Sequence, residues 1–281
     1  MGLRIQNNIE AFNTHRQLQI SSDAASSSME KLSSGYRINR AADDAAGLAI
    51  SEQMRGQIGG LDQAQRNAQD GISLVQTAEG SLDEVQSMIQ RVRDLKVQFN
   101  NGTLDSNDQD AIAAEVSQIG QELSDISKST SFNGNQLLTG KTFTFQVGAN
   151  DGENISTTAV TLSGGISTGG LSEITTLSDA AAVKTALSTG SLSSIDTVDN
   201  AIKGISTARA SYGAVENRLN HRLNNLATYQ ENLTASESRI RDVDMAAEMT
   251  NYTKENILQQ AGTSMLAQAN QSGQGVLSLL R

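Results

Sequence analysis

Hydrophobic residues recur with a helical period over most of the chain. From Ile58 to Phe99 they stand three or four positions apart, at Ile58, Leu61, Ala64, Ala68, Ile72, Val75, Ala78, Leu82, Val85, Ile89, Val92, Leu95 and Phe99. This spacing predicts one continuous helix. If it begins near Asp43, the helix has on the order of 55 residues and a length of about 80 Å, too long for one globular core to cover. We therefore expect partner helices along its length.

Two partner helices are predicted from the same kind of pattern. One lies between turns at residues 100–102 and 133–134, and its apolar positions are Ile112, Val116, Ile119, Leu123 and Ile126. The short loop before it predicts an antiparallel pair. The other helix comes from far along the chain, with apolar positions at Ile202, Ile205, Ala208, Tyr212, Val215, Leu219, Leu223, Leu226, Tyr229 and Leu233. Together they predict a mainly α fold, a long coiled-coil rod built from the N- and C-terminal halves.

Small and polar residues dominate the stretch between these helices. Residues 141–150, KTFTFQVGAN, alternate like a strand, and residues 155–165, ISTTAVTLSGG, are a candidate partner strand across the loop 148–152. Residues 156–195 are rich in Ser, Thr and Gly, with one helix expected near 178–188. We expect a small, solvent-facing segment that contains a β-hairpin.

The two ends of the chain carry apolar stripes interrupted by small polar residues, SSDAASSS in the first and NQSGQG in the second. Isolated helices of this size are marginal in water, and an exposed apolar helix face is an interaction surface or an aggregation liability. We expect both ends to become ordered when copies of the chain assemble. The residues expected to form this polymerisation interface are Ile5, Ile9, Phe12, Leu258, Met265, Leu266, Val276, Leu277 and Leu280.

The composition agrees with a helical chain of this kind. The sequence has no Pro, Cys or Trp and only 3% aromatic residues, so its apolar surface is expected to be buried in long seams of Ala, Leu, Ile and Val. The absence of Cys excludes disulfides and Cys-based metal sites. No continuous apolar run suits a signal peptide or a membrane span, so we expect no membrane insertion. If the chain leaves the cell, we expect a route that needs no cleaved signal peptide.

Charge is distributed unevenly. The first 40 residues carry a balance of +2, which leaves −12 on the remainder of a chain whose total is −10. A basic terminal arm suits docking on an acidic surface, although a solvated helix face explains it equally well. Nucleic acid is a poor partner for so acidic a body.

Candidate catalytic or metal-binding groups are few. His15 and His221 have no companion residues nearby that suggest a triad or a metal site, and we interpret both as structural or surface residues. Asp43 and Asp44 precede an Ala-rich helix, where capping is the simpler interpretation of paired carboxylates. Asn154 and Asn232 begin glycosylation sequons, a pattern that is common by chance. No zinc, phosphate-loop or nucleophile motif occurs, so we predict a protein that is not an enzyme and needs no cofactor.

Long motifs at both ends resemble bacterial flagellins, the subunits of the flagellar filament. LSSGYRINRAADDAAGLAISEQMRGQI and RNAQDGISLVQTAEGSLDEV resemble the N-terminal half of that family, and SRIRDVDMAAEMTNYTKENILQQAGTSMLAQANQ and VLSLLR resemble its C-terminal half. With FQVGAN, they cover nearly everything outside 156–195. Little room is left for outer domains, so the resemblance is to a minimal flagellin. One departure is that Ser272 and Gly273 follow LAQANQ, where many relatives have a Pro.

The resemblance implies a domain plan and a function. Residues 1–42 and 241–281 would be the two halves of the filament core domain, 43–140 and 196–240 the two halves of the rod, and 141–195 the outer segment. The implied function is a structural subunit for swimming motility, secreted unfolded and located in the extracellular flagellum. A hook–filament junction protein of the same family is the alternative. A secreted adhesin or receptor ligand is compatible as a secondary role.

The resemblance also implies partners. These are other copies of the chain, filament cap and hook-junction proteins, and an export chaperone at the C-terminal helix, about 240–281. In flagellins a surface resembling QRVRDLKVQ is recognised by an animal Toll-like receptor, and Arg91, Leu95 and Glu115 stand at the matching positions, whereas Asp94 and Lys96 depart from the commonest motif. The competing interpretation is an Arg91–Glu115 ion pair between helices with Leu95 in the seam. Residues 31–50 resemble a peptide that plant immune receptors detect.

Overall fold

The computed structural model describes the backbone of residues 8–161, 179–190 and 192–279, and side chains as far as Gln271. The mainly α fold is confirmed: the helices are α1 (Ile9–Ser34), α2 (Ala45–Phe99), α3 (Ser106–Ser129), α5 (Ala180–Ser188), α6 (Ile195–Arg241) and α7 (Met245–Leu279). The chain divides into two compact units. We call residues 58–230 the central unit, and residues 1–57 with 231–281 the terminal unit. The domain boundaries expected from the family resemblance stay a prediction.

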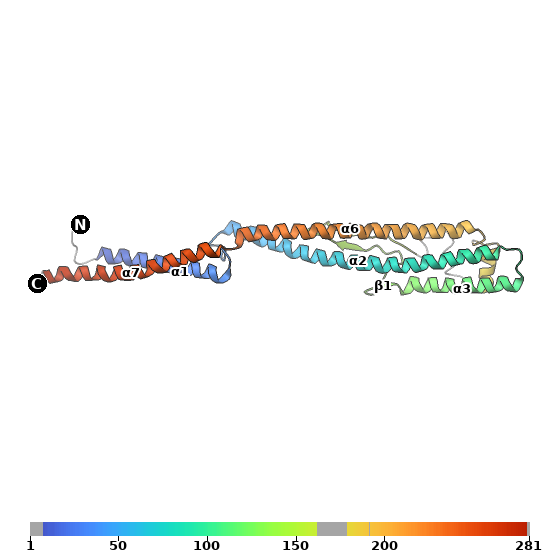
Figure 1. Cartoon of the computed structure of the whole chain (residues 1–281), viewed down its shortest axis with the longest axis horizontal. Coiled ribbons are helices and arrows are strands. Elements are labelled where there is room, and N and C mark those ends of the chain that lie inside the picture. The colour runs from blue at the N-terminus through green and yellow to red at the C-terminus, as the bar shows by residue number, and fades with distance from the viewer. Residues whose placement is uncertain (1–7, 162–178, 191, 280–281) are drawn as a thin grey trace. The chain divides into compact units, whose positions relative to one another are not determined.

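In the central unit α2 packs between two helices that run antiparallel to it, α3 and α6 (Figure 1). Contacts along the α2–α6 pair show the direction, because residues later in α2 meet residues earlier in α6. Polar bonds between the two helices join Arg93 to Asp199 at 2.6 Å, Arg209 to Asp83 at 2.7 Å and Gln76 to Glu216 at 2.8 Å. The predicted rod built from helices of both halves of the chain is therefore confirmed, and α2 and α6 are antiparallel in it.

The predicted apolar stripes form the core of the central unit. Leu82, Val85 and Ile89 of α2 are fully buried, as are Leu123 of α3 and Leu219 of α6. One member of the α6 stripe was predicted wrongly, since Tyr229 is 45% exposed. At this level Gln65 of α2 donates to Gln230 of α6, and two paired helices bury only the residues that lie directly between them.

The predicted hairpin is β3 (Thr144–Gln146) paired antiparallel with β4 (Asn154–Ser156). It lies against α2, where a Cβ on Gly71 would be 3.1 Å from the Phe145 ring, and Asn67 donates to the Gln146 carbonyl at 3.0 Å. A second hairpin joins β1 (Ser131–Phe132) to β2 (Asn135–Gln136). Its turn residues Asn133 and Gly134 both have positive φ, as a tight two-residue hairpin requires.

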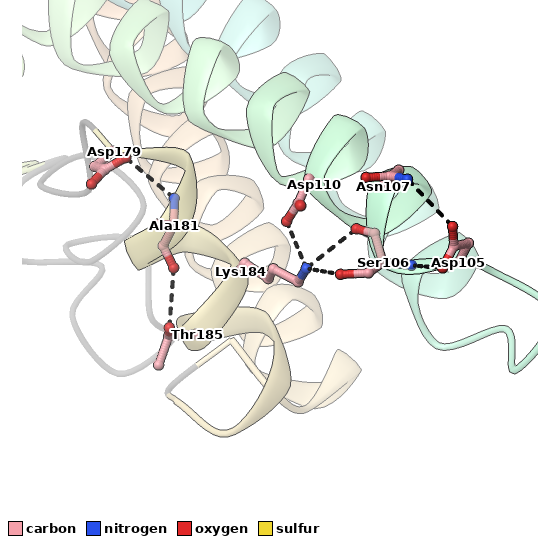
Figure 2. Close-up of polar contacts among 8 residues, drawn as sticks. All are labelled: Asp105, Ser106, Asn107, Asp110, Asp179, Ala181, Lys184 and Thr185. Carbon is pink, nitrogen blue, oxygen red and sulfur yellow. Dashed lines mark hydrogen bonds and ion pairs between the residues drawn. The ribbon is translucent and has the colours of Figure 1, made fainter.

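The predicted helix near 178–188 is α5, which docks against α2 and α3. Its apolar face is buried at Val183 and Leu187. Figure 2 shows Lys184 reaching from α5 to the first turn of α3, where its Nζ lies 2.6 Å from Asp110 Oδ1 and also bonds to Ser106. On the α2 side, Lys96 Nζ donates to the Leu187 carbonyl at 2.7 Å. Two lysines therefore attach this short helix to the bundle.

In the terminal unit α1 and α7 lie side by side and antiparallel (Figure 1). Asn8 Nδ2 donates to the Ala269 carbonyl at 2.8 Å, and Leu18 is in van der Waals range of Gly262. The loops that precede α2 and α7 are joined by backbone hydrogen bonds, Arg37 to Arg241 and Val243 to Gly35. These bonds link two chain segments that are far apart in sequence. None of the described helices is long and apolar enough to cross a membrane.

Candidate assembly surface

Large apolar side chains of α1 and α7 face outward in the terminal unit. Phe12 is 70% exposed and Met265 is 59% exposed. The others that are exposed on these two helices are Ile9, Ile20, Met29, Met245, Met249, Ile257 and Leu258. We call this set, with Phe12 and Met265, the assembly surface. In the central unit, by contrast, the apolar stripes are buried. Apolar side chains of similar size are therefore buried in one unit and exposed in the other.

The residues that α1 and α7 bury are small. Among the described residues of these helices, the buried ones are Ser21, Ala25, Ser28 and Ala269, while larger residues such as Leu18 are half-buried. Small side chains let two helices approach closely but bury little apolar area, and burial stabilises by about 25 cal/mol per Å². A helix pair of this kind is therefore weakly held by its own contacts and leaves its larger apolar groups for another surface.

The structure locates part of the predicted polymerisation interface. Ile9, Phe12, Leu258 and Met265 are exposed, and Leu266 is half-buried. Ile5, Leu280 and the side chains of Val276 and Leu277 lie outside the described residues. Sequence reasoning did not include five other exposed residues in this interface, Ile20, Met29, Met245, Met249 and Ile257. On α1, SSDAASSS interrupts the stripe between the first two, and no apolar repeat connects them.

Charged groups hold the loop between α1 and α2. Arg40 makes a two-pronged ion pair with Glu30 of α1, with both N–O distances at 3.0 Å. Asp43 Oδ2 accepts from the backbone amides of Arg40 and Asn39, and these hydrogen bonds hold the pKa of the Asp43 carboxyl below its ordinary value. Asp43 therefore holds the loop together and does not cap α2, contrary to the prediction for this residue.

Asp44 caps α2 itself, since its Oδ1 accepts from the Gly47 amide at 2.8 Å. A side chain at position 47 would collide with this cap, because a Cβ there would lie 2.4 Å from Asp44 Oδ2. Further along α2, Glu52 forms an ion pair at 2.6 Å with Arg241, the last residue of α6. The Arg241 guanidinium also lies over the Tyr36 ring. The hydrogen bond from Arg241 lowers the pKa of Glu52. The start of α2 is thus fixed by caps and ion pairs more than by apolar contacts.

The second predicted site lies on the α2–α3 face of the central unit. Arg91 and Glu115 form an exposed ion pair at 2.7 Å between the two helices. Leu95 is 2% exposed and belongs to the core. This is the arrangement of the competing interpretation, an exposed ion pair between the helices with Leu95 in the seam.

The histidines and the sequon residues named as candidates in the sequence lie on the surface. His15 and His221 are both exposed, as are the sequon residues Asn154 and Asn232. Across the described residues, no cluster of His, Cys, Asp and Glu side chains is arranged to hold a metal ion. The surface that has a distinct physical character is the apolar one on α1 and α7.

Comparison with known proteins places this architecture in a family. Models described as the bacterial flagellin N-terminal and C-terminal helical regions match residues 5–142 and 195–280. Residues 143–194 alone lie between the two matches, which confirms the expected compact form without a large outer domain. A hook-associated flagellar protein of Vibrio parahaemolyticus has a solved structure that aligns with a TM-score of 0.60 and 15% identity, covering 71% of this chain and 100% of that one. At 15% identity this likeness shows a shared fold and no more.

Two curated relatives are similar over nearly their whole length. A flagellin of Halalkalibacterium halodurans is 50% identical over 99% of both chains. A flagellin of Bacillus subtilis is 48% identical over 99% of this chain and 100% of its own. Because such identity extends through the helices that carry the assembly surface and through the central unit, this chain belongs to the bacterial flagellin family.

Proposed function

We propose that copies of this chain polymerise into the bacterial flagellar filament, which serves swimming motility, by burying the assembly surface of α1 and α7. The observation that carries the proposal is the exposure of large apolar side chains on a helix pair whose buried residues are small. Each Leu, Ile or Met that becomes fully buried contributes about 1.5–3 kcal/mol. Contacts between different faces of successive copies, which do not close into a ring, give an open helical filament.

The weak contact between α1 and α7 also bears on export and on the partners of the chain. A helix pair with few buried contacts and a chain with no Cys is easily kept unfolded for secretion through a narrow channel. We infer that a chaperone covers the C-terminal helix, about 240–281, before export. Filament cap and hook-junction proteins would meet the chain at the growing end and at the base of the filament. No cofactor enters this role, and the family is structural.

The hook–filament junction alternative has less support. The fold alone does not discriminate, because the hook-associated Vibrio protein shares it at low identity. Relatives with 48–50% identity over nearly the full chain carry the name flagellin, and this favours the filament itself.

A secondary role concerns immune recognition. We infer that an animal Toll-like receptor would contact Arg91 and Glu115, which are exposed, and that Leu95 supports this surface from inside the core. Because the two charged residues also bond to one another, Arg91→Ala is expected to weaken receptor binding while costing little stability, as exposed ion pairs contribute about 0–1 kcal/mol. Binding of the purified receptor domain to this variant and to Arg66→Ala, which breaks another exposed ion pair on α2, would test the role. Equal affinities of the receptor for the two variants would contradict this role.

Seeded polymerisation tests the main proposal. Chains that lack residues 1–40 or 245–281 should remain soluble with a folded central unit and should fail to extend filament fragments in electron micrographs. Phe12→Asp should also block extension, because it places a charge on the most exposed apolar position, whereas Asp151→Lys in the exposed β3–β4 loop should not. Normal filaments from either truncation would overturn the assignment.

A further inference from the structure

The methionines of this chain are concentrated on the assembly surface. Met29 on α1 and Met245, Met249 and Met265 on α7 are all among its exposed large apolar residues. Met88, the described methionine of the central unit that packs against the core, is half-buried. Since the chain contains no Cys and no Trp, thioether sulfurs are its softest targets for an oxidant. The most reactive groups of the molecule therefore stand where copies are proposed to meet.

We propose that Met29, Met245, Met249 and Met265 are oxidative modification sites that control polymerisation, an inference that rests on the proposed function. A peroxide supplies the oxygen. The sulfur lone pair attacks one peroxide oxygen, the O–O bond breaks, and the other oxygen leaves as water after proton transfer. The sulfur loses two electrons and becomes a sulfoxide, while the peroxide is reduced.

The modification changes the assembly surface in a specific way. A thioether is apolar and fits irregular contacts, whereas a sulfoxide is polar and needs a hydrogen-bond donor when it is buried. Met245 and Met249 stand one helical turn apart and therefore share a face of α7. The other large side chains of the assembly surface, such as Ile257 and Leu258 on α7 and Phe12 on α1, are apolar and offer no donor. Covering an oxidised face with another copy is therefore unfavourable, whereas the reduced face is suited to burial.

The free chain and the polymer should differ in sensitivity. In the free chain the four sulfur-bearing side chains are open to solvent, while in a filament that buries the assembly surface they are covered. Two methionine sulfoxide reductases, one for each sulfoxide epimer, should restore the subunit when a dithiol is supplied as the reductant. The oxygen leaves as water and the dithiol becomes a disulfide. The surface would then act as a reversible chemical switch for subunits that have not yet assembled.

The experiment uses the full-length chain and hydrogen peroxide as the oxidant. Peptide mass spectrometry should find +1 oxygen at Met29, Met245, Met249 and Met265 before Met88, and the treated chain should elongate filament seeds at least tenfold more slowly, equivalent to about 1.4 kcal/mol. Treated filaments should gain less oxygen at the same four positions. Incubation with both reductase types should restore elongation.

A variant that carries leucine at all four positions separates this idea from general oxidative damage. Leucine keeps volume and apolar character, so the variant should elongate seeds with or without peroxide, and Met88→Leu should stay as sensitive as the natural chain. Loss of elongation by the peroxide-treated quadruple variant, or normal elongation by the oxidised natural chain, would overturn the proposal. Failure of the untreated natural chain to elongate seeds would instead contradict the proposed function. If the quadruple variant fails to assemble untreated, single Met→Leu variants with mass mapping give the same comparison.

Discussion

Lys96 is a charged side chain inside the core of the central unit. It is 1% exposed, and burial lowers the pKa of its ammonium group. Its Nζ donates to the Leu187 carbonyl and to Asn100 Oδ1, and it lies 5.3 Å from the centre of the Phe99 ring. Among the described residues no carboxylate is bonded to it, and the described groups that offset the desolvation of its charge are neutral.

This burial predicts a pH dependence of stability. The unfolded chain holds the Lys96 proton up to about pH 10.4, but the folded chain releases it at lower pH. Between the two pKa values the unfolded state binds more protons, so the free energy of unfolding rises with pH. Compared with Lys96→Met by urea denaturation, the natural chain should therefore gain relative stability as the pH is raised from neutral toward 10.4. A difference that stays constant over this range would contradict the prediction.

Glycines in α2 differ in what surrounds them, and this predicts opposite effects of substitution. Gly80→Ala should stabilise the chain by about 0.8–1 kcal/mol, because Gly is a poor helix former and nothing lies within 4 Å of the added Cβ. Gly71→Val should destabilise it by about 1–3 kcal/mol, since the side chain must displace Phe145 and with it the β3–β4 hairpin. Urea midpoints of the two variants measure both effects. A stabilising Gly71→Val would show that the hairpin does not depend on this contact.

At the scale of elements, α5 is held by one ion pair that can be removed without touching its apolar face. Lys184→Met deletes the bonds to Asp110 and Ser106, while Val183 and Leu187 stay in the core. A partly exposed ion pair contributes up to about 1 kcal/mol, so hydrogen exchange of amides 180–188 should accelerate by roughly twofold to fivefold. Thr185→Ala is the matched control, because its hydroxyl bonds within α5 to the Ala181 carbonyl (Figure 2). Unchanged exchange in Lys184→Met would mean that apolar contacts alone dock the helix.

How far each element could be predicted depends on its length. The three long helices of the central unit follow from hydrophobic spacing, because many turns repeat the same signal, whereas α5 has only 9 residues and was expected from a short apolar run. The strands β1 and β2 have two residues each and too few positions to show alternation, although their turn was expected. Leu137 and Leu138 are fully buried but stand in a stretch that looks polar. No sequence pattern indicates that Lys96 is buried, because its place is determined by α5, which arrives from a distant part of the chain.

The sequence predicted an exposed apolar surface near both ends of the chain, but it identified only some of the residues in it. Exposed apolar stripes near both ends follow from the spacing of Ile9, Phe12 and Leu258. The rule that apolar residues face inward could not identify Ile20 or Met29, since that rule assumes that each helix buries its face within the same molecule. Under the proposed function, the surface that buries these residues belongs to another copy of the chain.

At the scale of the whole molecule, the two units should differ in stability. The central unit buries continuous stripes of Leu, Ile and Val from three long helices, whereas α1 and α7 are joined through Ser21, Ala25, Ser28 and Ala269. Local opening is easiest where few apolar contacts hold the backbone. The expectation is that α1 and α7 lose their helical hydrogen bonds while the central unit is still folded.

Hydrogen exchange followed by mass spectrometry on the free chain and on filaments measures this difference directly. In the free chain, amides of 9–34 and 245–271 should exchange well before those of 74–95, and heating should remove helical signal in two steps. In filaments the same terminal amides should become strongly protected, because other copies then cover their apolar faces. A single cooperative transition in the free chain, with α1 and α7 exchanging as slowly as α2, would mean that the helix pair is stable by itself. Exposure of its large apolar residues would then need a different explanation from assembly.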